Sequence, residues 1–232
     1  MLPIKDDQPR YSTPYVNTFL IVLNILVFFY QWTLGPRAGE AFIRIYGEVP
    51  SHLLAFLSGS PRYSLADVIV PLFTSMFLHG GWMHVLGNMW WLFIFGDNVE
   101  DYLGHLKYFL FYILAGLMAM VTQIAIYPYS NVPTVGASGA IAGVLGAYFI
   151  LYPRGRVLTW FFVFLLYLPA WVVLGEWFVM NFFSGAATLS MAQPGRDMGG
   201  VAFWAHVGGF VAGMVMIKLF PERRQRSPYA YR

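Results

Sequence analysis

Cysteine is absent from this sequence of 232 residues, which excludes disulfide bonds, thiol catalysis and cysteine-ligated metal sites. Charged residues are also scarce, at 11% of the chain against about 25% in a typical soluble domain. The formal net charge is only +3 and no basic run is interleaved with aromatic residues, so no nucleic-acid partner is expected. Hydrophobic residues make up 58% of the chain, and this composition indicates an integral membrane protein.

Six segments are apolar over the length that a bilayer crossing requires, which is about 20 residues for a helix. We expect them near 15–34, 76–96, 106–127, 135–152, 156–180 and 201–220. Residues 35–75 are too polar to span and are expected to form an outer loop with short helices at the membrane surface. The sequence thus predicts an all-α, polytopic protein, in which residues 15–220 form a six-transmembrane-helix bundle.

Lysine and arginine indicate the orientation, because cytoplasmic connections carry an excess of both. We expect residues 1–14 to be a short cytoplasmic N-terminus and residues 221–232 to be a basic cytoplasmic tail. The segments then assigned to the cytoplasm contain Lys5, Arg10, Lys107, Arg154, Arg156, Lys218, Arg223, Arg224, Arg226 and Arg232, and the outer segments contain Arg37, Arg44, Arg62 and Arg196. Residues 1–14 have no signal-peptide or transit-peptide pattern, which favours a prokaryotic inner membrane as the host.

Polar residues of three predicted helices share one depth. Ser138 and His206 each precede, by 15 residues, the proline that ends their segment, which places both about 22 Å above the inner boundary. His84 precedes the aspartate that ends its segment by 13 residues, or about 20 Å. This level lies in the outer third of a hydrocarbon core of about 30 Å, below the surface but reachable by water.

These residues have the chemistry of a serine hydrolase. A histidine within hydrogen-bond reach activates a serine hydroxyl, so we expect Ser138 to be the nucleophile and His206 the general base. His84 and Asn88 are four residues apart and therefore share a helix face. Together with the backbone N–H of Ser138, they are expected to bind the oxyanion. Each residue alone has a plainer interpretation, Ser138 as a packing residue and His206 as half of a helix–helix hydrogen bond.

Glycines favour a close approach of the two helices concerned. Gly139 and Gly143 follow the serine, and Gly209 and Gly213 follow the histidine, both with the small-xxx-small spacing of membrane helix contacts. No carboxylate is expected beside His206. Glu176 lies 20 residues past the start of its predicted segment, about 30 Å up and therefore at the outer interface. The sequence therefore predicts a Ser–His dyad.

Four motifs follow one another from about Phe73 to Gly213. They are His79-Gly-Gly-Trp-Met-His84-Val-Leu-Gly-Asn88, Gly96-Asp-Asn-Val-Glu100-Asp-Tyr-Leu-Gly104, Gly136-Ala-Ser138-Gly and Ala205-His206-Val-Gly-Gly209. In this order the sequence resembles the rhomboid family of intramembrane serine proteases. The resemblance implies a six-helix fold whose short fourth helix starts at the serine, inside a water-filled cavity.

The resemblance also implies an activity and a set of roles. It implies cleavage of peptide bonds in or beside the transmembrane segments of other proteins, with transmembrane protein substrates and the lipid bilayer as partners. It implies no metal and no cofactor. By position, it assigns Ser138 and His206 to the dyad and His84 and Asn88 to the oxyanion group, and it gives structural roles to residues 79 and 100.

Two positions depart from the family pattern. Val70-Pro71 stand where the family often carries a Trp-Arg pair, and Ala142 stands where many members pack an aromatic ring on the catalytic histidine. Another residue is therefore expected to support the His206 ring. Residues 181–200 are rich in small residues and are expected to form a mobile cap over the site.

Two other classes of function remain open on composition alone. A non-catalytic rhomboid-fold protein that binds or extracts membrane clients typically lacks the serine or the histidine, and this chain has both. A small transporter would favour paired interrupted helices and repeat symmetry, and the sequence shows neither. The sequence therefore predicts an intramembrane serine endopeptidase, and it sets no oligomeric state.

Overall fold

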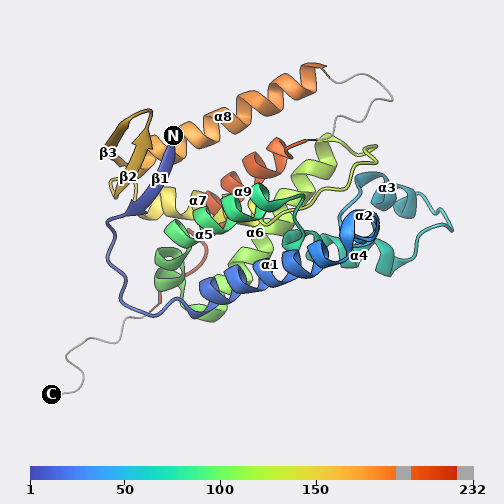
Figure 1. Ribbon diagram of the computed structural model, residues 1–232, viewed down its shortest axis with the longest axis horizontal. Helices are drawn as coiled ribbons and strands as arrows, with labels where there is room; N and C mark the ends of the chain where they lie inside the picture. The colour runs from blue at the N-terminus through green and yellow to red at the C-terminus, as the bar shows by residue number, and fades with distance from the viewer. Residues whose placement is uncertain (192–199, 224–232) are drawn as a thin grey trace.

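The computed structural model describes residues 1–191 and 200–223 as a bundle of helices with a small sheet at one end (Figure 1). The helices are α1 (Tyr15–Thr33), α2 (Gly35–Tyr46), α3 (Pro50–Leu57), α4 (Leu65–Thr74), the 3-10 helix η1 (Ser75–Phe77), α5 (Trp82–Leu103), α6 (His105–Ile126), α7 (Ser138–Leu151), α8 (Ala170–Met191) and α9 (Phe203–Met216). The strands are β1 (Leu2–Asp6), β2 (Arg156–Phe161) and β3 (Phe164–Pro169). The predicted helical class is confirmed, with the sheet as an addition.

Among the described residues, α1, α6 and α8 are each long and apolar enough to cross a membrane. A fourth crossing is available if Leu65–Phe77 and α5 form one segment, which bends by 75° at its break. Helices α7 and α9 have 14 residues each, or about 21 Å, which is shorter than a hydrocarbon core of about 30 Å. The chain is therefore a multi-pass membrane protein with two short apolar helices among its longer ones.

Helix α7 lies in the middle of the bundle, where every residue from Gly139 to Tyr148 is buried. It packs against α5, α6 and α9. A Cβ atom added at Gly213 of α9 would lie 2.7 Å from the Cα of Gly143, and one added at Gly146 would lie 2.9 Å from the carbonyl carbon of Phe210. Only glycine fits at these positions, and this backbone contact brings α9 alongside α7.

The prediction of a membrane helix over 156–180 is wrong for residues 156–169, which form an antiparallel hairpin of β2 and β3. The run from Val157 to Gly175 has no charged residue, so hydropathy alone does not show a break. Its first part is rich in aromatic and β-branched residues, which favour strands, and Pro169 directly precedes α8. Strand β1 pairs with β2, so part of the predicted N-terminal tail belongs to the sheet.

The later start of α8 corrects two further predictions. Glu176 lies near the beginning of the helix and not at the far interface, and its Oε1 is 3.7 Å from the amino group of Met1. Residues 181–191 continue α8, so they are not part of a loop. The rest of the predicted cap, residues 192–199, and the basic tail after Arg223 lie outside the described residues.

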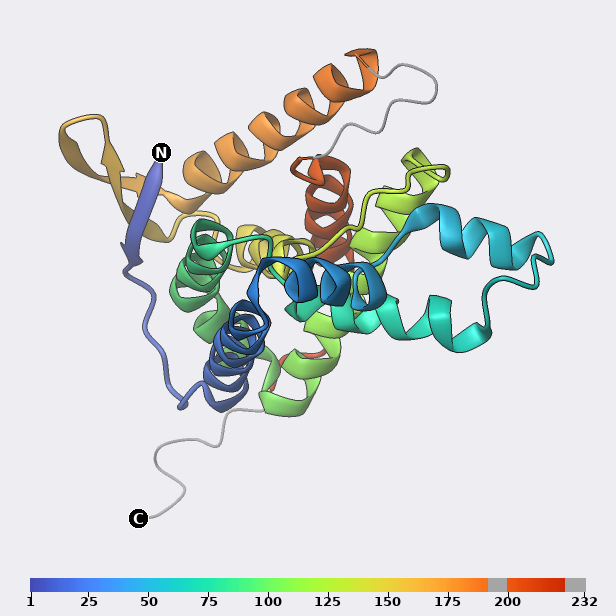
Figure 2. The ribbon, with the colours of Figure 1, turned by 45° about the vertical axis from the view of Figure 1, so that its right-hand side comes forward.

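The two ends of the bundle carry different elements. The sheet lies at one end, and the short helices α2, α3 and α4 lie at the other, within the predicted outer loop (Figures 1 and 2). Helix α4 starts with a capping box, in which Ser64 and Asp67 bond to each other's backbone N–H.

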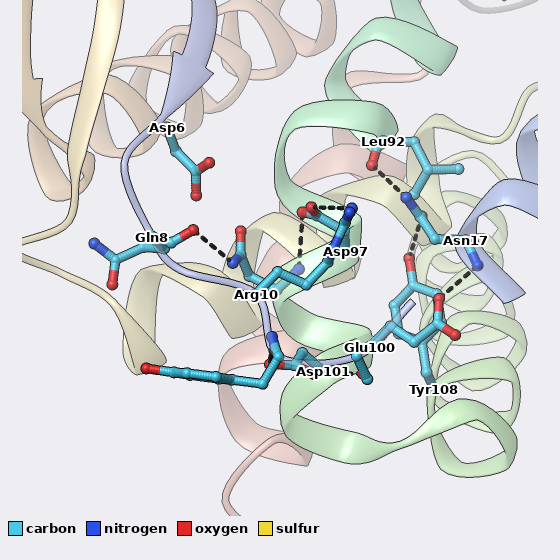
Figure 3. Close-up of polar contacts among 12 residues, drawn as sticks. Asp6, Gln8, Arg10, Asn17, Leu92, Asp97, Glu100, Asp101 and Tyr108 are labelled. Atoms are coloured by element: carbon cyan, nitrogen blue, oxygen red, sulfur yellow. Dashed lines mark hydrogen bonds and ion pairs between the residues drawn. The ribbon is translucent and has the colours of Figure 1, made fainter. Parts of the chain in front are cut away.

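Polar contacts tie α1 to α5 and α6 at the end near the sheet (Figure 3). The carboxylate of Glu100 accepts the backbone N–H of Asn17 at 2.7 Å, and the Asn17 amide donates to the Leu92 carbonyl at 3.1 Å. The Tyr108 hydroxyl donates to Asn17 Oδ1 at 2.8 Å, and Arg10 pairs with Asp97 at 3.2 Å. Glu100 is fully buried and bonded, as the structural role implied for it requires.

Candidate active site

The first residue of α7 and the first turn of α9 meet through their side chains. The Oγ atom of Ser138 lies 2.8 Å from Nε2 of His206, and the histidine is 8% exposed. Ser138 reaches this position because the glycines of α7 and α9 allow the two backbones to touch. The distance is that of a hydrogen bond between a hydroxyl and an imidazole nitrogen, the geometry in which a base can take the proton of an attacking serine.

A third polar residue, Asn181 of α8, contacts the other ring nitrogen of His206. Its Oδ1 lies 2.6 Å from Nδ1, while its Nδ2 donates to the carbonyl of Trp177 at 2.8 Å. Because the amide nitrogen donates to that carbonyl, the oxygen faces the ring and accepts a hydrogen bond from Nδ1–H. The neutral imidazole then has an unprotonated Nε2, the tautomer that accepts a hydrogen bond from the serine. The predicted Ser–His dyad did not include this contact between Asn181 and His206.

Trp177 also packs on His206, with ring centroids 5.5 Å apart and planes inclined by 34°. It supplies the support that Ala142 does not give. Asn181 was not among the predicted site residues because the predicted helix ended before it, at position 180, and position 181 fell in the predicted loop. Trp177 lay within that predicted helix, but no contact with His206 was expected for it. The four-residue spacing of Trp177 and Asn181, on one helix face, was the available signal.

His84 and Asn88 lie on α5 and line the same cavity as Ser138 and His206. Both face the backbone just before the serine. A Cβ atom added at Gly136 would lie 2.7 Å from His84 Nε2 and 3.6 Å from Asn88 Nδ2. Gly136 also has a backbone φ of +125°, which residues other than glycine rarely adopt. The structure thus brings all four predicted site residues to one place.

His79, which precedes α5, contacts the part of this helix that carries Asn88. It is fully buried, its Nε2 lies 3.0 Å from Asn88 Nδ2, and Gln31 of α1 bonds to both its backbone N–H and its carbonyl. The Nδ1 of His84 accepts the backbone N–H of Gly80 at 3.3 Å. These contacts fix the orientation of both candidate oxyanion side chains.

The cavity has a volume of about 1120 Å³ and lies between α5, α8 and the segment 128–135 that precedes α7. Because Ser138 starts α7, its backbone N–H belongs to the helix N-terminus, where the N–H groups have no partner within the helix and the helix dipole favours negative charge. Within residues 1–191 and 200–223, no three His, Cys, Asp or Glu side chains gather in a group that could hold a metal ion. What the site offers is a hydroxyl, a base and hydrogen-bond donors.

The segment that leads into Ser138 is held by the outer loop. Glu48, between α2 and α3, exchanges backbone hydrogen bonds with Thr134 at 3.2 and 2.7 Å. A Cβ atom added at the adjacent Gly47 would lie 2.9 Å from the Val135 side chain. Glu48 is 1% exposed, and within the part of the chain that the structure describes its Oε1 has no hydrogen-bond partner. Burial raises the pKa of this carboxyl from 4.5 to about 7.

We expect Glu48→Gln to stabilise the protein above pH 7. The folded state holds the Glu48 proton more tightly than the unfolded state, so stability falls as pH rises from about 4.5 to about 7. The amide cannot ionise, and the gain at pH 8 should approach roughly 3 kcal/mol and shrink strongly near pH 5. Thermal unfolding in detergent at both pH values tests this, with the exposed Glu40→Gln as a control. An equal effect of Glu48→Gln at both pH values would contradict it.

The amino-acid sequence is also similar to those of known proteins. A family model described as the Rhomboid domain matches residues 67–223, more than half of the chain. The chain belongs to the rhomboid family. Among its relatives, Rhomboid-like protein 11, chloroplastic, from Arabidopsis thaliana is 29% identical over 154 residues, 64% of this chain and 51% of that protein.

Two mitochondrial rhomboid proteins are similarly distant. Presenilin-associated rhomboid-like protein, mitochondrial, from Bos taurus is 25% identical over 221 residues, 84% of this chain and 54% of its own length. Rhomboid protein 1, mitochondrial, from Saccharomyces cerevisiae is 27% identical over 165 residues, 68% of this chain and 44% of its own length. The chain spans about half the length of the curated relatives it matches.

Proposed function

We propose that this rhomboid is an intramembrane serine endopeptidase, which hydrolyses peptide bonds in or beside the transmembrane segments of other membrane proteins. The observation that carries the proposal is the 2.8 Å contact between Ser138 Oγ and His206 Nε2 inside a large cavity of a membrane bundle. A client-binding rhomboid relative without catalytic activity needs neither the hydroxyl nor the base. No metal or cofactor takes part in the proposed reaction.

The proposed chemistry follows from the positions of the side chains. Ser138 Oγ attacks the substrate carbonyl carbon while His206 Nε2 takes the hydroxyl proton, and Asn181 holds the ring in the required tautomer. The tetrahedral oxyanion lies among His84, Asn88 and the backbone N–H of Ser138. His206 then gives its proton to the leaving amine as the C–N bond breaks. Water, with its proton taken by His206, hydrolyses the acyl-enzyme and restores the serine.

We propose a topology in which the N-terminus, the connection between α7 and α8, and the end of α9 share the cytoplasmic side. Strand β1 pairs with β2, and the backbone N–H of Arg223 donates to the Tyr102 carbonyl at 2.7 Å, near the end of α5. These contacts place three lysine- and arginine-bearing regions at one end of the bundle, in line with the positive-inside rule. A prokaryotic inner membrane fits this topology, whereas the similar proteins named above are chloroplastic or mitochondrial.

A fluorophosphonate probe, which reacts with activated serines, tests the proposal. We expect the detergent-solubilised wild type to be labelled, and Ser138→Ala and His206→Ala to be unlabelled although folded. Circular dichroism and size-exclusion chromatography report folding independently. A folded wild type that neither takes the probe nor cuts a transmembrane reporter protein would favour the client-binding alternative.

A further inference from the structure

The β2–β3 hairpin exposes an apolar surface that the proposed chemistry does not use. At its tip, Phe162 and Val163 are 81% and 82% exposed, and the following Phe164 and Leu165 are 60% and 64% exposed. A strand with one face in water alternates apolar and polar side chains. All four residues from Phe164 to Tyr167 are apolar or aromatic and exposed, so both faces of β3 present apolar side chains to the surroundings.

The backbone at the tip is strained, although an aromatic residue occupies it. Phe162 has a φ of 53°, in the left-handed region, where glycine or asparagine is the usual residue. A bulky residue in this region costs on the order of 1–3 kcal/mol. The Phe162 ring is 81% exposed, so packing within the chain does little to compensate for this strain. Contact with something outside the chain would compensate for it.

The position of the hairpin indicates what lies outside. It projects from the bundle beside the first turns of α8, the spanning helix that follows it (Figure 2). Its exposed surface continues into that of α8, where Trp171 is 54% and Phe183 66% exposed. A spanning helix turns such residues toward lipid, so the hairpin surface is continuous with a lipid-facing surface.

The charged residues of the sheet lie away from the hairpin tip, as expected of an element whose tip enters a phospholipid surface. The exposed Arg156 pairs with Pro169, the exposed Lys5 pairs with Leu158, and Asp6 pairs with Val157, so these charged residues lie in the half of the sheet away from the hairpin tip. Toward the tip, Trp160 pairs with Leu165, and no charged residue follows Arg156 until Glu176. Cations near phosphates, with tryptophan and tyrosine at the interface, form the usual pattern of membrane-surface elements.

We propose that the β2–β3 hairpin is immersed in phospholipid at the boundary between headgroups and acyl chains, in the leaflet on the side of the N-terminus. The depth follows from the backbone. β3 is an outer strand of the sheet, so one edge has N–H and C=O groups without strand partners, and these require water or headgroups. The apolar side chains require acyl chains, so both needs are met at the boundary and not in the hydrocarbon centre.

Strand β1 of the sheet is fixed to the bundle. The Tyr148 hydroxyl of α7 donates to Asp6 at 2.5 Å, and the Trp90 indole of α5 donates to the Pro3 carbonyl at 2.7 Å. Lipid at the tip and protein at the base therefore hold the start of α8 at a set depth. Since α8 carries Asn181 and Trp177, this anchor also sets the height of the residues that contact His206.

Depth-dependent fluorescence quenching tests the proposal on the full chain. The sequence has no cysteine, so single cysteines at Phe162, at Phe183 of α8 and at the exposed Glu222 can each carry an environment-sensitive fluorophore in phosphatidylcholine–phosphatidylglycerol liposomes. Quenchers are aqueous iodide and lipids with a nitroxide at a shallow or a deep acyl position. We expect the Phe162 probe to resist iodide and to be quenched several-fold more by the shallow nitroxide than by the deep one, with Glu222 open to iodide.

Three results would overturn the proposal. Iodide quenching of the Phe162 probe equal to that at Glu222 would place the tip in water. Protection from iodide and from both lipid nitroxides would show that protein covers the tip, as in contact with a second copy of the chain. Stronger quenching by the deep nitroxide, as expected at Phe183, would place the hairpin too deep. A second label at Leu165→Cys repeats the test without altering the strained turn, and none of these results depends on peptidase activity.

Discussion

Ser138→Ala and His206→Ala are each expected to lower the rate of cleavage by roughly 10⁵-fold or more, and the double variant is expected to cleave no more slowly than either single variant. The serine loses its nucleophilic oxygen in one case and its base in the other, and the two groups act as one unit across a 2.8 Å hydrogen bond. The measurement is kcat in liposomes for a transmembrane reporter protein.

A matched control is available in Ser75→Ala. Ser75 is a buried serine, and its backbone carbonyl accepts the N–H of Gly136, close to the site, but its Oγ has no hydrogen-bond partner among the described residues. Removing that hydroxyl should leave kcat within about twofold. If folded Ser138→Ala still turned over the reporter, or if the effects of Ser138→Ala and His206→Ala multiplied, the proposed mechanism would be wrong.

The four predicted site residues could be found in the sequence because their signals are local. Ser138 and His206 each lie beside glycines, and a helix has a fixed rise, so counting residues from each segment end gave a common depth. His84 and Asn88 share a face because they are four residues apart. The structure places all four around one cavity.

The α8 contribution could not be found in the same way, since it depends on where that helix begins. From Val157 to Gly175 the chain has no charge, and both a membrane helix and a lipid-facing hairpin produce such a run. When the helix starts at Ala170, Glu176 lies near the beginning of the helix, and Asn181 lies within the helix, beside His206. Pairing of β1 with β2 is a contact between residues more than 150 positions apart, which local patterns do not report.

Asn181→Leu is expected to lower kcat by roughly 10- to 100-fold with little change in KM. Leucine has a similar size but no oxygen to accept a hydrogen bond from Nδ1–H of His206, so the ring loses its fixed tautomer and orientation. Trp177 would still pack on the ring, which is why the expected loss is smaller than that for His206→Ala. Substrate contacts in the cavity are unchanged, and this accounts for the constant KM.

Two further variants separate positioning of His206 from a general structural role of Asn181. Asn181→Asp keeps an oxygen at the position 2.6 Å from Nδ1 and should recover most of kcat, which a packing role alone would not predict. Asn24→Leu is the matched control, since the Asn24 amide is also buried and also donates to the carbonyl four residues earlier, at 2.8 Å, but it lies in α1 away from His206. Equal losses of kcat in Asn24→Leu and Asn181→Leu would show that a buried helix amide matters only for stability. A loss confined to Asn181→Leu, reversed in Asn181→Asp, would make Asn181 the residue that orients the catalytic base.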